Sequence, residues 1–184
     1  MTIEKSTTHF RGRVITVTVD EVLLPNGNRA SLELVHHPGG AAVVALDDKD
    51  QVCLLRQYRH AAGDWLWELP AGKLEPDEPP LLTAQRELVE EAGVSAATWS
   101  SLGVYLSSPG VFNEVLHLYL AKDIKPATAA HEAAEVIEVH WLPLAEAYEW
   151  ALNGKIRDGK TAIGLLRAFG RSRNAGGSDF PQEA

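Results

Sequence analysis

Cysteine and long apolar runs are almost absent from this chain of 184 residues. Its single cysteine, Cys53, excludes an internal disulfide and lies in the apolar run VCLL, where a buried thiol is expected. No segment approaches the roughly 20 apolar residues that a membrane-spanning helix needs, and the N-terminus does not resemble a signal peptide. We therefore expect a cytoplasmic protein without a membrane partner.

Positive charge is also scarce, because 17 lysines and arginines face 25 acidic residues and the net charge is −8. This balance argues against a nucleic-acid partner and against an anionic membrane surface. It does not exclude a small phosphate-bearing substrate, since a bound divalent cation reverses the charge of its surroundings. The length and a hydrophobic content of 45% are sufficient for one core without cross-links.

The residue pattern predicts an α+β fold with many strands and few helices. Residues 10–24 alternate and are rich in β-branched side chains, and the turn PNGN leads to an antiparallel partner at 29–36. Residues 1–8 are polar and are expected to fray. Further strands are expected at 41–46, 51–57, 97–107, 115–121 and 135–142, a mobile polar loop at 122–134, and helices at 143–153 and 159–169. We assign 1–40 to N-terminal strands, 41–170 to the main domain and 171–184 to a disordered tail.

An acidic cluster lies on another predicted helix, where Glu87, Glu90 and Glu91 fall within five residues. Spacings of three and four residues place these side chains on one face, which we expect to be exposed and directed toward the loop around Gly72. A solvated acidic face is the alternative interpretation. Prolines at the expected helix start and Gly93 at its end favour a built site, and clustered carboxylates suit Mg²⁺ or Mn²⁺.

A basic and aromatic cluster precedes this helix. Arg56 and Arg59 are either surface arginines or contacts for a pyrophosphate or ribose, and position favours the second interpretation for Arg56. Trp65 and Trp67 either pack in the interior or stack on a base. Farther along, Glu114 ends a candidate binding loop and is either a surface residue or a site carboxylate.

The acidic helix carries a family resemblance. Gly72, Glu78 and the run RELVEEAGV from Arg86 to Val94 resemble the Nudix box at every fixed position. The resemblance implies an α/β/α sandwich with a mixed β-sheet, and a hydrolase that cleaves a nucleoside diphosphate linked to another group with bound Mg²⁺ or Mn²⁺. It implies a Glu78–Arg86 salt bridge that braces the loop and helix. The implied metal ligands are Glu87, Glu91, Glu90 (direct or through water) and the backbone carbonyl of Ala71.

A closer resemblance, from about residue 10 to residue 169, is to the ADP-ribose pyrophosphatase branch. The segments LLRQYRH, WELPAGKLE, LSSPGVFNE and GKIRDGKTAIGLLRA carry it. It implies cleavage of ADP-ribose, or a related nucleotide-sugar, to AMP and a sugar phosphate. It also implies a homodimer in which the N-terminal strands cross between subunits. Arg56 and Glu68 match positions that contact substrate, and Arg59 and Glu114 are further candidates.

The catalytic base is expected in the loop before the last strand, where the branch usually has a glutamate. Glu135 is preferred as this base and Glu132 is the alternative, and Glu91 is the other catalytic residue expected. His131 is expected to be a surface residue. Two alternatives to the ADP-ribose hypothesis are a pyrophosphatase for another substrate, such as a GDP-sugar, and a non-catalytic sensor of nucleotides. The sensor is disfavoured because the carboxylates of the box are all present.

Overall fold

The structure, a computed structural model, describes residues 1–130 and 136–173. The chain forms two compact units. The smaller unit comprises Met1–Gly39 and Leu106–Val115, and the larger one comprises Gly40–Tyr105 and the described part of the chain from Leu116 onward. None of the described helices is long and apolar enough to cross a membrane.

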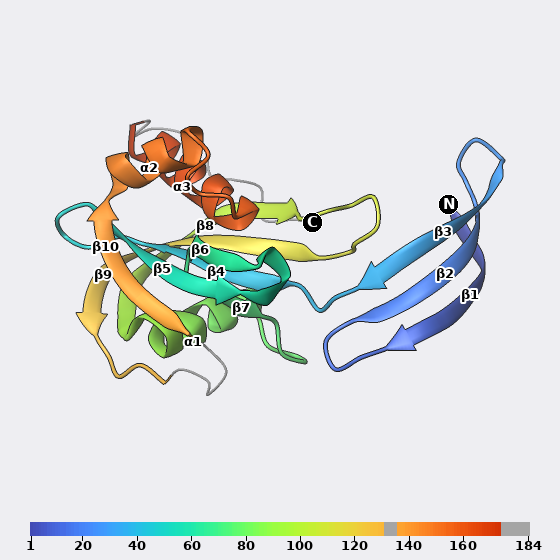
Figure 1. Ribbon diagram of the computed structural model, residues 1–184, viewed down its shortest axis with the longest axis horizontal. Coiled ribbons are helices and arrows are strands. Elements are labelled where there is room, and N and C mark those ends of the chain that lie inside the picture. The colour runs from blue at the N-terminus through green and yellow to red at the C-terminus, as the bar shows by residue number, and fades with distance from the viewer. Residues whose placement is uncertain (131–135, 174–184) are drawn as a thin grey trace. The chain divides into compact units, whose positions relative to one another are not determined.

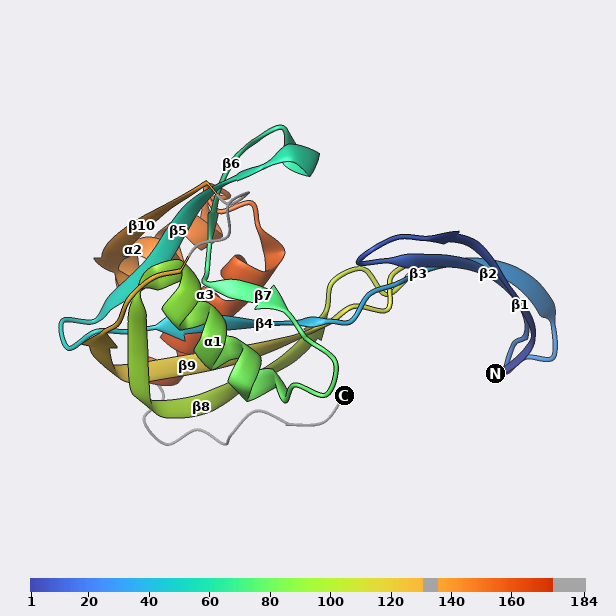
Figure 2. The same ribbon diagram turned by 90° about the horizontal axis from the view of Figure 1, so that it is seen from below.

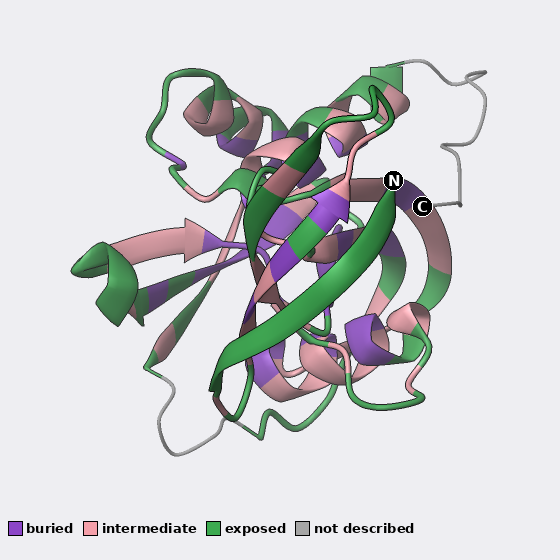
Figure 3. Cartoon of the chain, turned by 90° about the vertical axis from the view of Figure 1, so that its right-hand side faces the viewer, coloured by how far each residue is buried: buried purple, intermediate pink, exposed green. Residues whose placement is uncertain are grey.

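The smaller unit contains an antiparallel sheet with the order β1-β2-β3, formed by β1 (Thr2–Arg11), β2 (Thr16–Leu23) and β3 (Arg29–His36). The predicted hairpin of the second and third strands is confirmed. The expectation that residues 1–8 fray is wrong, because they pair with β2 along almost its whole length. Main-chain hydrogen bonds and polar side-chain pairs, such as Ser6 with Asp20, hold β1 without apolar burial, and all its residues are exposed (Figure 3).

The larger unit is built on two sheets (Figure 1). One has the order β7-β4-β9-β8 and is mixed, because β4 runs parallel to β9 and antiparallel to β7. The other has the order β10-β5-β6 and is antiparallel. Their strands are β4 (Gly40–Ala45), β5 (Gln51–Arg59), β6 (Asp64–Glu68), β7 (Ala71–Lys73), β8 (Val94–Leu106), β9 (Val115–Pro126) and β10 (Ile137–Pro143); a short 3-10 helix (His60–Ala62) follows β5.

Helices cover both faces of the sheet around β4 (Figure 2). They are α1 (Pro80–Ala92), α2 (Leu144–Leu152) and α3 (Gly159–Arg173). Because strand side chains alternate, Ala41, Val43 and Ala45 pack in a core with α1, whereas Ala42 and Val44 pack in a core with α2 and α3. Strand β4 is therefore buried throughout, and the expected α+β sandwich is confirmed.

Two elements extend well beyond the sequence expectation at their C-terminal ends. Strand β9 continues to Pro126, so the start of the segment 122–134 is strand and not loop. Helix α3 continues to Arg173, so residues 170–173 are helical, and the rest of the expected disordered tail lies outside the described residues. Cys53 is fully buried between the sheets and α1, as expected.

Candidate active site

Helix α1 carries the acidic cluster between two sharp boundaries. Pro80 occupies the first helical position, where its missing N–H removes no hydrogen bond. The helix ends at Gly93, whose φ of 65° is left-handed and whose N–H donates to the carbonyl of Val89. The prolines and the glycine therefore fix the two ends of the helix that carries the carboxylates.

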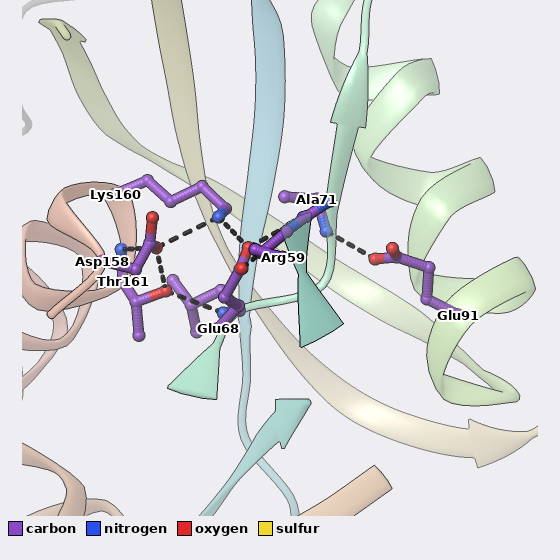
Figure 4. A network of polar contacts seen from close by, with 8 residues as sticks. Arg59, Glu68, Ala71, Glu91, Asp158, Lys160 and Thr161 are labelled. Carbon is purple, nitrogen blue, oxygen red and sulfur yellow. Dashed lines mark hydrogen bonds and ion pairs between the residues drawn. The ribbon is translucent and has the colours of Figure 1, made fainter. Parts of the chain in front are cut away.

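Glu91 does not lie on an exposed face, and that expectation is wrong. It is 3% exposed, because it follows Ala84 and Leu88 along the stripe of α1 that packs on the sheet. Its Oε2 accepts a hydrogen bond of 2.7 Å from the backbone N–H of Ala71 (Figure 4). Burial, with the nearby Glu91 charge, raises the pKa of Cys53 to about 12, so this thiol is not a nucleophile at neutral pH.

Gly72 gives the Glu87 carboxylate its place. A Cβ atom added to Gly72 would overlap both carboxylate oxygens of Glu87. A side chain at position 72 would therefore force the Glu87 carboxylate out of its present place. The predicted juxtaposition of this glycine with the acidic helix is present in the structure.

Arg86 connects three carboxylates. Its Nε and Nη2 donate to the two oxygens of Glu78 at 3.1 and 3.0 Å, and its Nη1 donates to Glu87 at 2.7 Å and Glu90 at 3.0 Å. The hydrogen bonds from Arg86, with one from the Thr83 hydroxyl, lower the pKa of Glu78 to about 2. The predicted Glu78–Arg86 salt bridge is confirmed.

The α1 carboxylates are held by Arg86 and by the Ala71 amide and do not form a preformed metal cage. Across residues 1–130 and 136–173, no three acidic, histidine or cysteine side chains are grouped as a metal site. The contacts give the reason, because Arg86 holds Glu87 and Glu90 while Glu91 accepts from the backbone of Ala71. Their oxygens are still the hard donors that Mg²⁺ and Mn²⁺ prefer, gathered at the junction of α1 and β7.

Glu68 lies in a second charged network beside this junction. Its carboxylate is 2% exposed and accepts two hydrogen bonds from Arg59, at 2.7 and 2.9 Å, and one from Lys160. Burial raises its pKa, but the hydrogen bonds and charges of Arg59 and Lys160 outweigh burial and lower the pKa to about 2. Both Glu68 and Arg59 thus have structural partners, and substrate contact by either stays a prediction.

Arg56 is more accessible, with 46% of its side chain exposed. Its guanidinium lies 5.5 Å from the Trp65 ring centroid and 3.9 Å from Glu138. Trp65 also contacts the exposed Tyr58 edge-on. Trp67, in contrast, packs against Trp150 and His140, which favours the packing interpretation for that residue.

The remaining predicted residues lie elsewhere or outside the description. Glu114 belongs to the smaller unit, where its carboxylate lies 3.2 Å from His37 Nδ1. Its role stays a prediction. Glu132, Glu135 and His131 fall in the segment that the structure does not describe, so the choice of base also stays a prediction.

Sequence reasoning predicted the start of α3 but missed that Asp158, Lys160 and Thr161 lie there beside the residues before β7 (Figure 4). The available signal was the order Asp-Gly-Lys-Thr before an apolar helix. Aspartate immediately before a helix caps its first turn. Such a signal marks a helix start, but it does not show that the same residues contact a segment more than 90 positions earlier.

Comparisons with known proteins agree with this geometry. The NUDIX domain profile matches residues 36–162. The "ADP-ribose pyrophosphatase" of Mycobacterium tuberculosis is 40% identical over 169 residues, covering 90% of this chain and 81% of the relative. The "Methanol dehydrogenase activator" of Bacillus methanolicus is 39% identical over 158 residues, covering 85% of each chain. A crystal structure of an "ADP compounds hydrolase" has the same fold, with a TM-score of 0.82, 23% identity and 95% of each chain covered. The chain therefore belongs to the NUDIX domain family.

Proposed function

We propose that this protein hydrolyses the pyrophosphate bond of ADP-ribose or a related nucleoside diphosphate sugar, releasing AMP and a sugar phosphate. The observation that carries the proposal is the approach of two α1 carboxylates to β7, Glu91 to the Ala71 amide and Glu87 to Gly72, with Glu90 joined to Glu87 through Arg86. The similarity to a relative named as an ADP-ribose pyrophosphatase supports the substrate class. A sensor without activity would not need all three carboxylates of α1, Glu87, Glu90 and Glu91.

The residues present fit Mg²⁺ or Mn²⁺. Glu87, Glu90, Glu91 and the carbonyl of Ala71 are oxygen donors, and Gly72, which has no side chain, provides the space that the Glu87 carboxylate occupies. When bound, such a cation supplies positive charge that offsets the pyrophosphate and makes water more acidic. Arg86 donates hydrogen bonds to Glu87 and Glu90, which orients both carboxylates and balances part of their charge.

The proton of the attacking water is assigned to a loop carboxylate. Glu135 is the preferred general base and Glu132 the alternative, and either needs only to orient water or accept its proton. On the substrate side, the accessible guanidinium of Arg56 suits a pyrophosphate or ribose oxygen. Arg59, Glu68 and Glu114 remain further candidates for substrate contact.

A homodimer is part of the proposal. Among the described residues of the smaller unit, Val22 is the only apolar side chain that is fully buried. A three-stranded sheet with so little core needs another surface to be stable. Exposed apolar residues on β1 and its neighbours, Ile3, Phe10, Val14 and Leu32, suit a second copy of the chain.

The test is hydrolysis of a panel of pyrophosphates with Mg²⁺ or Mn²⁺, by the protein and by Glu91→Gln. The panel contains ADP-ribose, ADP-glucose, GDP-mannose, NADH and 8-oxo-dGTP. We expect a preference for ADP-ribose that a chelator abolishes. We expect Glu91→Gln to lose about a hundredfold or more in rate while remaining folded, because an amide still accepts the Ala71 N–H but carries no charge.

Glu146→Gln is the matched control, since it removes one charge from an exposed position on α2. It should leave the rate unchanged. Near-normal activity of Glu91→Gln would contradict the ligand assignment. Tight binding of a panel member without turnover would favour the sensor, and preference for GDP-mannose would keep the chemistry and replace the substrate.

A further inference from the structure

Residues 69–71, which lead from β6 into β7, are held from two opposite sides (Figure 4). Leu69 donates its backbone N–H to Thr161 Oγ1 on α3 at 2.8 Å, and Ala71 donates its N–H to Glu91 on α1 at 2.7 Å. Pro70, between them, has no N–H, and its carbonyl accepts from the N–H of Val43 at 2.9 Å. Each of these main-chain groups thus has one fixed partner.

The Thr161 hydroxyl can accept from Leu69 because its own proton is committed elsewhere. It donates to Asp158 Oδ2 at 2.5 Å, and an ionised carboxylate can only accept. Asp158 therefore sets the direction of the hydroxyl and presents its lone pairs to Leu69. The same carboxylate oxygen accepts the backbone N–H of Thr161 at 3.0 Å and so caps the start of α3.

Packing fixes α3 at this place. Thr161 is fully buried, and Leu69 is 1% exposed. One turn along α3, a Cβ atom on Gly164 would come within 2.6 Å of Leu69 Cδ1, so the helix lies directly on the Leu69 side chain. Neighbouring Lys160 contacts the carboxylate of Glu68 and lies 3.1 Å from Asp158. The segment cannot shift toward or away from α3 without breaking these contacts.

We propose that Thr161, oriented by Asp158, is a positioning residue for the cation site. By fixing the amide of Leu69, it fixes the path of the chain through Pro70 to Ala71, whose N–H holds Glu91 and whose carbonyl belongs to the proposed ligand set. The inference rests on the proposed function, because it assigns to α3 the placement of two ligands of that site. Thr161 is not itself among the proposed ligands of the site.

The test compares Thr161→Val with Thr161→Ser in the full chain. Valine has the shape of threonine without the hydroxyl, whereas serine keeps the hydroxyl. Mutation of a residue that holds metal ligands in place typically weakens metal binding about 10- to 100-fold. We therefore expect Thr161→Val to raise the Kd for Mn²⁺ by about tenfold, as measured by electron paramagnetic resonance. Thr161→Ser should bind Mn²⁺ like the parent protein. The KM for ADP-ribose at saturating Mn²⁺ should not change in either variant.

Leu165→Val is the control for stability, because it removes buried volume from the same helix without touching the hydrogen bonds. It should lower the melting temperature and leave the Kd for Mn²⁺ unchanged. A normal Kd in folded Thr161→Val, or an equal loss in Leu165→Val, would overturn the inference. If Thr161→Val does not fold, Asp158→Ala serves instead, because Asp158 is less buried and its removal frees the Thr161 hydroxyl to turn. The Kd of Asp158→Ala for Mn²⁺ must then rise as well.

Failure of the proposed function gives a different result. If the parent protein neither binds Mn²⁺ nor hydrolyses any pyrophosphate of the panel, the proposed function falls and this inference with it. If the parent protein does both and Thr161→Val matches it, only the inference falls.

Discussion

Single residues define this site through charge and space. Arg86 places one guanidinium against three carboxylates, so the cluster is tolerated in the absence of a cation. Gly72 provides the space that the Glu87 carboxylate occupies. Neither effect depends on neighbours far along the chain, which is why both follow from the spacing of the motif.

Gly72→Ala tests the role of space. The added methyl group must displace the Glu87 carboxylate, and a misplacement of about 1 Å in a catalytic group lowers activity by about a hundredfold. We expect such a loss in kcat/KM for ADP-ribose, together with weaker Mn²⁺ binding. Gly170→Ala is the control, because a Cβ there meets no atom within 4 Å. Unchanged kinetics in Gly72→Ala would show that Glu87 does not act from this position.

At the scale of elements, Glu68 joins three parts of the larger unit. It ends β6, Arg59 ends β5, and Lys160 lies in the first turn of α3. Buried ion pairs are costly to break by removing one partner, because the other charge is left without compensation. The network therefore ties these elements together only while Glu68 is ionised.

Stability at low pH tests this network. The pKa of Glu68 is about 2 in the folded protein and 4.5 as an ordinary glutamate, so the folded state favours the ionised form. Its contribution is present above pH 4.5 and is lost as the pH falls through the folded pKa. We expect Glu68→Gln to lower the free energy of unfolding by about 3 kcal/mol at pH 7 and to flatten its fall between pH 4.5 and 2.

Urea unfolding at several pH values measures both effects. Asp64→Asn is the control, because this carboxylate pairs with Arg157 on the exposed surface and its loss should matter little. The same pH dependence in Glu68→Gln and in the parent protein would show that Glu68 is not the group that titrates.

Elements also show what the sequence can predict and what it cannot. Helix α1 was predictable because its prolines, its glycine and its carboxylate spacing are local signals. The burial of Glu91 was not, because an acidic residue at a core position is recognised only by its partner, the amide of Ala71. The contacts of Thr161 and Lys160 with residues 68 and 69 depend on tertiary packing. Strand β1 was missed because polar residues pair through their backbone as readily as apolar ones.

At the scale of the whole molecule, the two units differ in how they reach stability. The larger unit has two apolar clusters, one on each face of the sheet around β4. The smaller unit has Val22 as the single buried apolar residue in its described chain, while Ile3 and Phe10 on β1 are more than half exposed. A surface of this kind is expected to be covered by another chain, and the proposed occupant is a second copy.

The double variant Ile3→Glu, Phe10→Glu tests this occupant. Two charges on β1 would have to be buried in the dimer without partners, so association should be lost and the mass in light scattering should halve. Lys49→Glu, in the turn between β4 and β5, is the control for added negative charge and should stay dimeric. A parent protein that is monomeric at all concentrations would contradict the proposal directly. A double variant that stays dimeric would place the interface away from β1, because these side chains would then be exposed in the assembly as they are in the single chain.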